Sequence, residues 1–216
     1  FNNLYLLLKL FIITSGDHMQ TIKNNTHNEI IIKNSRFICY LYKIKDLNDI
    51  QNYLSNIKSI EKDATHYCYA YILNDLKKSS DDGEPSGTAG FPILKVLENN
   101  NLSNILAIVI RYFGGIKLGA GGLVRAYTKS VTNTLSIDNI ISLTPGYNLT
   151  IEFNYNQIKE IDYLLKDITI NNKEFNNTII YNIDIPSNFL ETIKINNINY
   201  QINKEILIED NHLSNK

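Results

Sequence analysis

The sequence predicts an α+β protein with two domains, and three observations lead to this class. Its 216 residues are 44% hydrophobic and 20% charged, which is typical of a globular chain long enough for one or two cores. Hydrophobic patterns with the period of a strand and with the period of a helix both occur along the chain. A strong chain breaker, Thr144-Pro145-Gly146, separates a longer first part from a second part with shorter elements.

Composition limits the classes of function. A formal net charge of -1 gives no general attraction to nucleic acid or anionic lipid, so such binding needs a local cluster of charge. Two cysteines, Cys39 and Cys68, fit neither a disulfide scaffold nor a Cys-x-x-Cys metal site, which predicts a cytoplasmic protein without structural zinc. Residues 1–146 carry 15 basic and 12 acidic residues, whereas residues 147–216 carry 6 and 10. The first domain is therefore the better candidate for binding a polyanion.

The first 18 residues are expected to lie upstream of the native protein or to be disordered. The apolar run Leu4 to Ile13 is too short to span a bilayer and contains Lys9. It also lacks the basic start and the small-residue cleavage site of a secretory signal. The only methionine is Met19, so translation starting there would leave residues 1–18 outside the protein. We expect no membrane association.

The first domain, residues 19–144, begins with strands. Two strand-like runs between Asn28 and Lys43 are separated by Asn34-Ser35, which predicts a hairpin. Asp46 is then expected to cap a helix that continues through Lys62, because apolar residues recur there at helical spacing. A strand over Tyr67 to Leu73 follows.

The middle of this domain is rich in glycine. Residues Asn74 to Gly90 are expected to form a loop, followed by a short helix near Ile93 to Glu98. The β-branched run Ile105 to Tyr112 predicts a strand buried on both faces. The glycine-rich segment Gly114 to Gly122 then leads into a helix over Leu123 to Leu135.

The second domain, residues 145–211, is predicted to follow the order βαββαβ, the ferredoxin-like unit. Residues 212–216 are expected to form a frayed tail. The six elements are expected at residues 148–153, 156–166, 168–171, 178–185, 187–195 and 205–209.

The glycine-rich turn is the strongest candidate for a binding site. Glycine is needed where φ is positive or where a ligand approaches the backbone, and this turn leads into a helix N-terminus with free N–H groups. Nucleotide-binding motifs are not complete here, because Ala120-Gly121 stands where a P-loop needs Lys-Ser/Thr. Val124 likewise stands at the third glycine of a dinucleotide motif.

Charge supports an anion site at this turn. No acidic residue lies between Glu98 and Asp138, a window that contains four cations. The alternative is that these cations are merely solvated and that the glycines only permit close packing. The predicted anion or nucleic-acid site contains Arg111, Gly114, Gly115, Lys117, Gly119, Gly121, Gly122, Arg125 and Lys129.

A second cluster is acidic. Asp81, Asp82 and Glu84 lie within four positions, and their carboxylates could bind Mg²⁺ weakly. The same residue types are explained without an ion if Asp81 or Asp82 forms an Asx-turn and Thr88 caps the next helix. We therefore assign no metal site and expect no cofactor.

His66 and Cys68 lie two residues apart and share a strand face. A Cys-His nucleophilic pair would need hydrogen-bond reach and an orienting group, so an ordinary buried thiol and a hydrogen-bonded histidine are the favoured interpretation. The alternating Tyr67, Tyr69 and Tyr71 could stack on bases but are expected to pack within the protein. No catalytic residue is assigned.

Four segments in the first domain resemble the signature blocks of the IMPACT/YigZ family, specifically its bacterial two-domain branch. In proteins of that branch, the chain is expected to start at the position that Met19 occupies here. The segments occur in order over about residues 30 to 140. They are Ser35-Arg36-Phe37, Ala64 to Tyr71 (ATHYCYAY), Asp81 to Leu94 (DDGEPSGTAGFPIL) and Arg111 to Tyr127 (RYFGGIKLGAGGLVRAY).

The resemblance implies a fold and a setting. It implies a first domain similar to the ribosomal-protein fold of elongation factor G domain IV, and a second domain similar to that factor's last, ferredoxin-like domain. Eukaryotic IMPACT proteins regulate translation by competing for the activator of a stress kinase, and the bacterial relatives are associated with nucleic acid or ribosome binding. Fold analogy alone does not establish function.

The combined prediction is a non-catalytic regulatory protein, associated with translation or the ribosome, that binds RNA or another polyanion through its first domain. The second domain is acidic, and Ile179 to Ile183 does not supply the aromatic pattern of an RNA-recognition motif. Two alternatives remain open: a Mg²⁺-dependent enzyme acting on a phosphorylated small molecule, and an adaptor that binds a protein partner. The sequence does not determine the oligomeric state.

Overall fold

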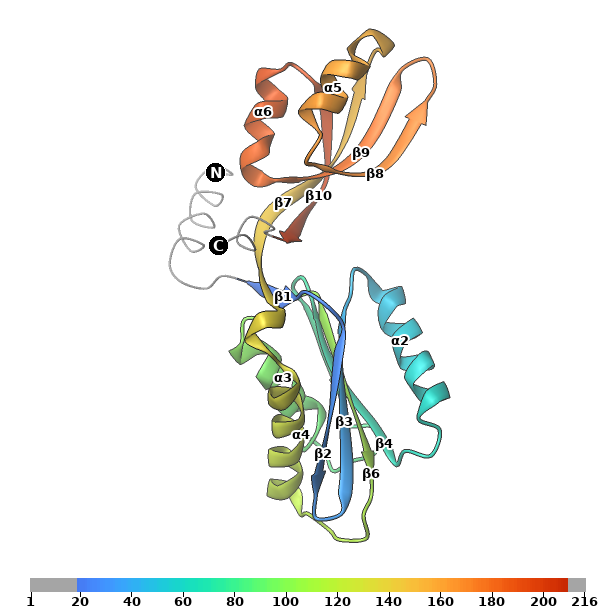
Figure 1. Cartoon of the computed structure of the whole chain (residues 1–216), viewed down its shortest axis with the longest axis vertical. Helices are drawn as coiled ribbons and strands as arrows, with labels where there is room; N and C mark the ends of the chain where they lie inside the picture. The colour runs from blue at the N-terminus through green and yellow to red at the C-terminus, as the bar shows by residue number, and fades with distance from the viewer. Residues whose placement is uncertain (1–18, 210–216) are drawn as a thin grey trace. The chain divides into compact units, whose positions relative to one another are not determined.

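A computed structural model describes residues 19–209 of the chain (Figure 1). It contains two compact units. Unit 1 ends at Ser142, and unit 2 begins at Leu143. Within the described residues, no helix has the length and apolar character needed to cross a bilayer. The predicted upstream segment, residues 1–18, and the predicted tail, residues 212–216, lie outside the described part of the chain.

Unit 1 has three layers. A five-stranded antiparallel sheet in the order β2-β3-β6-β4-β5 lies between helix α2 on one face and helices α3 and α4 on the other (Figure 1). Its main elements are β2 (Thr26–Ile32), β3 (Ser35–Lys43), α2 (Leu47–Ile60), β4 (His66–Leu73), β5 (Leu76–Ser80), α3 (Gly90–Asn99), β6 (Ile105–Tyr112) and α4 (Ala120–Thr134).

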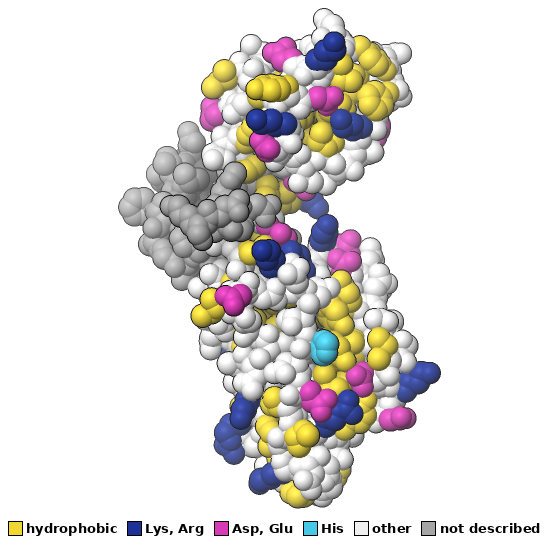
Figure 2. Space-filling model, viewed as in Figure 1, with side chains coloured by type: hydrophobic (Ala, Val, Ile, Leu, Met, Phe, Trp, Pro, Cys, Tyr) yellow, Lys and Arg dark blue, Asp and Glu magenta, His cyan; other side chains and the backbone are white. Residues whose placement is uncertain are grey.

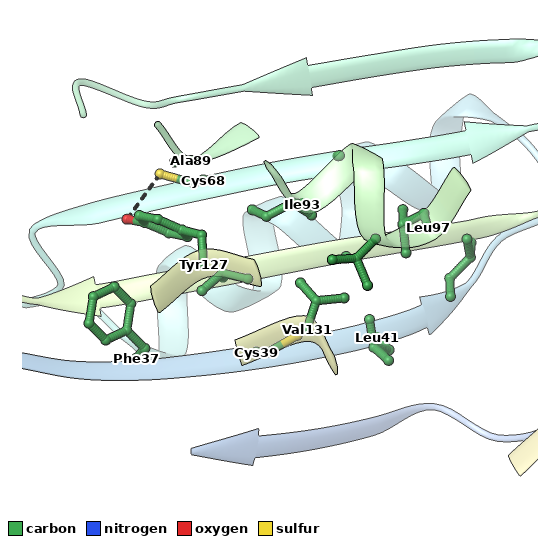
Figure 3. Packing of buried hydrophobic residues seen from close by; sticks show 14 of the residues in the cluster. Phe37, Cys39, Leu41, Cys68, Ala89, Ile93, Leu97, Tyr127 and Val131 are labelled. Atoms are coloured by element: carbon green, nitrogen blue, oxygen red, sulfur yellow. Dashed lines mark hydrogen bonds between the residues drawn. The ribbon is translucent and has the colours of Figure 1, made fainter. Parts of the chain in front are cut away.

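The central strand β6 is buried on both faces, as its continuous apolar sequence predicts. Residues Ile105 to Ile110 are fully buried, and alternate side chains pack toward opposite helical layers. On the side of α3 and α4, Tyr127 packs edge-on against Phe37, as Figure 3 shows among the other core side chains. The largest buried side chain of α4 is therefore fixed directly over the sheet.

The hairpin between β2 and β3 turns one residue earlier than expected. Lys33 and Asn34 both have positive φ, 46° and 64°, and Ser35 already belongs to β3. Two-residue hairpin turns favour positive φ at both central positions, which asparagine tolerates. Position 35 is thereby placed in the sheet, where its hydroxyl becomes part of the site described below.

The expectation of a continuous loop from Asn74 to Gly90 is wrong in its first half, because β5 occupies Leu76–Ser80. Asn74, with φ of 51°, makes the tight turn into this strand. The sequence Leu-Lys-Lys-Ser-Ser shows no alternation because β5 is an exposed edge strand with no buried face to specify. The remaining loop, residues 81–89, is short and leads directly into α3.

The domain boundary predicted at Thr144-Pro145-Gly146 lies close to the boundary between the units at Ser142 and Leu143. The expected break in regular structure is absent, because strand β7 runs without interruption through Ile140–Phe153. Pro145 lies where β7 pairs with β10 alone, so one edge of the strand has no partner and a missing N–H is tolerated. A Cβ at Gly146 would lie 2.5 Å from the Ile185 carbonyl oxygen and 2.4 Å from Ile208 Cδ1. Glycine is therefore required here for close packing.

The first three residues of strand β7, residues 140–142, belong to unit 1. They pair with the short strand β1 (Gln20–Ile22).

Unit 2 contains a four-stranded antiparallel sheet in the order β10-β7-β9-β8. Both helices pack on one core with the buried faces of β7 and β9. Short 3₁₀ turns precede the helices, which are consequently shorter than expected, while β8 and β10 are longer. After β7, the elements are α5 (Ile158–Leu164), β8 (Thr169–Phe175), β9 (Ile179–Pro186), α6 (Leu190–Ile195) and β10 (Asn199–Glu209).

Candidate functional site

Segments that are far apart in the sequence meet at one end of unit 1. The Thr65 amide donates to the Arg111 carbonyl at 2.8 Å, and the Gly114 amide donates to Ser35 Oγ at 3.2 Å. His66 Nδ1 lies 2.8 Å from the Asp82 carbonyl oxygen. We call this region, formed by residues 33–36, 64–67, 81–90 and 111–119, the loop end of unit 1.

A buried ion pair occupies the centre of the loop end. Arg111 Nη1 donates to Glu84 Oε1 at 2.7 Å, and the two side chains are only 6% and 3% exposed. Tyr127 donates its hydroxyl to the same carboxylate oxygen at 2.8 Å, while Arg111 Nη2 donates to Ser35 Oγ at 3.3 Å. The pair therefore joins β6, the acidic loop, α4 and β3.

This pairing corrects two expectations from sequence. Arg111 was expected to contact an anionic ligand, but its charge is buried and balanced by Glu84. Glu84, in turn, is not available as a weak metal ligand. The sequence did not reveal the pair because 27 positions separate its members and both belong to clusters of exposed residue types.

The other two acidic residues are also bonded within the protein. Asp81 accepts hydrogen bonds from the amides of Gly87, Ala89 and Gly90 at 2.8, 3.0 and 2.8 Å, and so caps α3. Burial opposes ionisation of Asp81, but these three amides outweigh it and lower the pKa of the carboxyl. Asp82 Oδ2 accepts from the Tyr67 amide at 2.7 Å.

Thr88 is not the helix cap that the sequence predicted. Ala89 occupies the N-cap position, and the Thr88 hydroxyl donates to the Pro85 carbonyl at 2.6 Å. Asp81, eight residues before Ala89, performs the capping instead. Among the described residues, no three His, Cys, Asp or Glu side chains are grouped so that they could hold a metal ion. The acidic loop is thus explained by its structural contacts.

Cys68 and His66 do not form a nucleophilic pair. Burial, the largest effect, raises the pKa of the Cys68 thiol to about 12, so the thiol stays protonated at neutral pH. Its Sγ donates to the Asp81 carbonyl at 2.9 Å and lies 3.3 Å from the Tyr127 hydroxyl, the contact drawn as a dashed line in Figure 3. Burial also raises the pKa of Tyr127, which keeps its hydroxyl protonated as a donor to Glu84.

The glycine-rich turn, residues 113–119, projects from this buried network. Gly115 and Gly119 have φ of 82° and 72°, which explains why glycine stands at both positions. A Cβ at either position would meet no atom within 4 Å. Gly119 is the N-cap of α4 and supplies no side-chain acceptor. Among the described residues, none outside α4 accepts a hydrogen bond from amides 115–122.

The cations near this turn are exposed. Lys117, Arg125 and Lys129 have no ion-pair partner among the described residues. Arg125 Nη1 lies 3.5 Å from the position that a Cβ on Gly121 would take, so the guanidinium lies over the first turn of α4. In Figure 2, dark blue side chains line the edge of unit 1 that α4 and the turn form.

Two predicted site residues are not accessible: Arg111 is buried, and Gly114 packs against Asn34 and Ser35 with its amide bonded to Ser35 Oγ. Gly122 is half-buried, and the exposed members of the predicted site are Gly115, Lys117, Gly119, Gly121, Arg125 and Lys129.

Comparison with known proteins places this site in a family. The model of the Impact N-terminal domain matches residues 33–135, which include every segment of the loop end. The chain is 41% identical over 158 residues to IMPACT family member YvyE of Bacillus subtilis, covering 68% of this chain and 73% of that protein. The chain belongs to the IMPACT family.

Other relatives agree with this assignment. IMPACT family member YigZ of Escherichia coli is 34% identical over 163 residues, covering 72% of this chain and 80% of that protein. Protein IMPACT of Rattus norvegicus is 32% identical over 95 residues, covering 40% and 29% of the two chains. A crystal structure described as that of a hypothetical protein is 28% identical, with a TM-score of 0.67, and covers 87% of this chain and 97% of its own.

Sequence reasoning missed two residues that organise the loop end of this IMPACT family protein. Ser35 accepts hydrogen bonds from both Arg111 and Gly114 through one oxygen, and Tyr127 connects Cys68 to Glu84. Each looks like an ordinary polar or core residue in its own segment. The available signal was their position inside the family-like blocks, which marked them without indicating a role.

The Asp81 cap predicts a pH-dependent stability. Because the folded-state pKa of Asp81 is lowered, its contribution is present above the pKa of the unfolded chain and is lost as pH falls through the folded-state value. Replacing Asp81 with Ala should reduce the free energy of unfolding by about 1 to 2 kcal/mol at pH 7. Thermal unfolding should show the difference from wild type shrinking below about pH 4.

Asp75→Ala provides the matched control, because Asp75 is exposed in the turn before β5. The Asp75→Ala substitution should change the free energy of unfolding by less than about 0.5 kcal/mol both at about pH 7 and at about pH 3. A constant gap between wild type and Asp81→Ala from pH 7 to pH 3 would contradict the capping role.

Close packing of Gly114 predicts a second effect on stability. A Cβ at Gly114 would lie 2.0 Å from the Asn34 carbonyl carbon and 2.4 Å from the Ser35 amide nitrogen. Gly114→Ala should therefore destabilise the protein by about 1 to 3 kcal/mol, because backbone must move. Gly121→Ala should be neutral or stabilise by up to about 1 kcal/mol, since a Cβ there meets only Arg125 Nη1 at 3.5 Å. The Gly114→Ala and Gly121→Ala variants can be compared by the urea concentration at which half of each is unfolded. Equal midpoints would refute the packing argument.

Proposed function

We propose that this IMPACT family protein is a non-catalytic regulator, associated with translation or the ribosome, that binds RNA or another polyanion through unit 1. The observation that carries the proposal is the set of three exposed cations, Lys117, Arg125 and Lys129, beside an exposed glycine turn. No acidic residue lies between residues 99 and 137 to neutralise them. A local positive surface of this kind attracts phosphate even when the whole chain is nearly neutral.

The glycine turn supplies a second attraction for phosphate. The first amides of an α-helix have no acceptor within the helix, and the helix dipole adds positive potential at that end. In α3 these amides are taken by Asp81, whereas α4 begins at Gly119 without a side-chain cap. Phosphate oxygens would therefore accept from the start of α4 while Lys117 and Arg125 supply the charge.

The translation setting is supported by family membership and by the proposed architecture. We propose that unit 1 corresponds to the ribosomal-protein fold of elongation factor G domain IV. We also propose that unit 2, with strand order β10-β7-β9-β8 and two helices on one core, is a ferredoxin-like domain. The two buried, unpaired cysteines suit a reducing cytoplasm.

Neutralising two exposed cations tests the phosphate contacts. The double variant Lys117→Gln and Arg125→Gln should bind RNA more weakly and with a shallower dependence on salt. Each lost contact to single-stranded RNA should reduce the slope of log K against log salt concentration by roughly 0.7. Fluorescence anisotropy with a labelled RNA over a series of KCl concentrations measures this slope.

Lys159→Gln combined with Lys204→Gln is the matched control, because it removes the same number of exposed charges from unit 2. The control should leave the slope unchanged. Equal slopes for wild type and the Lys117/Arg125 variant would exclude this surface as the polyanion site.

A further inference from the structure

The glycine turn presents apolar side chains together with its cations. Phe113 is 48% exposed and Ile116 is 45% exposed, and Val124 on the first turns of α4 is also exposed. These side chains contribute nothing to attracting phosphate. A partner that offers both negative charge and a flat apolar surface could use these side chains together with Lys117.

The Phe113 ring packs on the guanidinium of Arg111, a member of the buried ion pair. The guanidinium carbon of Arg111 lies 5.4 Å from the centroid of the Phe113 ring and 5.4 Å from that of the buried Phe37 ring. Glu84 fixes the guanidinium in this position, and the Phe113 amide donates to Thr65 Oγ1 at 3.1 Å. Phe113 is thus a half-exposed residue whose ring and backbone are both held by contacts within unit 1.

We propose that Phe113 stacks against an unpaired base of single-stranded RNA whose phosphates contact Lys117 and Arg125. This inference rests on the proposed function and narrows its ligand to one class. Base–aromatic stacking beside a positive groove is the general way in which proteins hold single strands, because every base has a π-face. Paired bases in a duplex are already stacked on each other and do not offer that face to Phe113.

Charge and shape favour RNA over an acidic peptide. Lys117 lies in the same turn as Phe113, and the Arg125 guanidinium lies over the first turn of α4. A ligand that contacts all three must therefore combine negative groups with a planar apolar group. A nucleotide strand repeats that arrangement at every unit. A peptide supplies it only through a particular sequence.

Tryptophan provides a direct probe, because the chain contains none. Phe113→Trp places a single indole on the turn, and its fluorescence should be quenched when an eight-nucleotide oligoadenylate RNA binds. An abasic eight-unit strand of equal charge should bind without that quenching. Phe175→Trp is the matched control, since Phe175 is 55% exposed in unit 2, and its fluorescence should not respond to either strand.

Affinity provides the second measurement. Phe113→Ala should weaken oligoadenylate binding roughly 5- to 100-fold, leave abasic-strand binding unchanged and keep the slope of the salt dependence. Phe113→Tyr retains a ring and should restore most of the affinity. Circular dichroism and thermal unfolding of each variant confirm that the fold is intact, as expected for a half-exposed side chain.

The outcomes separate this inference from the proposed function. If Phe113→Ala binds oligoadenylate as tightly as wild type while the Lys117/Arg125 variant binds more weakly and with a shallower salt dependence, base stacking is wrong and the polyanion site stands. The same conclusion follows if wild type binds the abasic strand and oligoadenylate equally well. If wild type binds neither strand, both proposals fail.

Discussion

The buried pair of Arg111 and Glu84 is the interaction on which the loop end depends. Two charges removed from water are costly unless each is paired and hydrogen-bonded, and here Tyr127 and Ser35 supply the additional bonds. These four residues come from four different segments, so the segments must meet in one arrangement for the charges to be balanced. The pair therefore fixes the geometry of the loop end of unit 1, where the β2–β3 hairpin, the acidic loop and the glycine turn meet.

Two helices on the same face of the sheet begin in different ways, and that difference gives the loop end its polarity. The first amides of α3 are bound by the carboxylate of Asp81, so that helix start is neutralised within the protein. The N-cap of helix α4 is Gly119, which has no side chain to perform this role. The uncompensated positive end of a dipole thus lies next to side chains of the same sign, and both effects act on any anion that approaches.

Much of this architecture follows from patterns that are local in sequence. The unbroken apolar run of β6 predicted a strand buried on both faces, and the acid-free window predicted the exposed cations of α4. What failed depends on partners distant in sequence. Arg111 looked like a ligand contact because Glu84 lies on another segment, and β5 was hidden because an exposed edge strand needs no alternation. Thr144-Pro145-Gly146 predicted a break because the pairing of β7 with β10 cannot be seen from those three residues.

The burial of Arg111 removes one cation from the proposed anion site and leaves the other three exposed. Because Glu84 balances Arg111, the attraction that reaches a ligand comes from Lys117, Arg125 and Lys129, whose side chains lie outside the core. The buried charges that connect the segments of the loop end are therefore those of Arg111 and Glu84, whereas the exposed charges belong to other residues. Phe113 connects the two sets, since its ring packs on the buried guanidinium and its exposed part belongs to the turn. In the proposed site, a ring already packed on a buried guanidinium would need little further ordering when a base stacks on it, which favours stacking at Phe113 over contacts made by Lys117 alone.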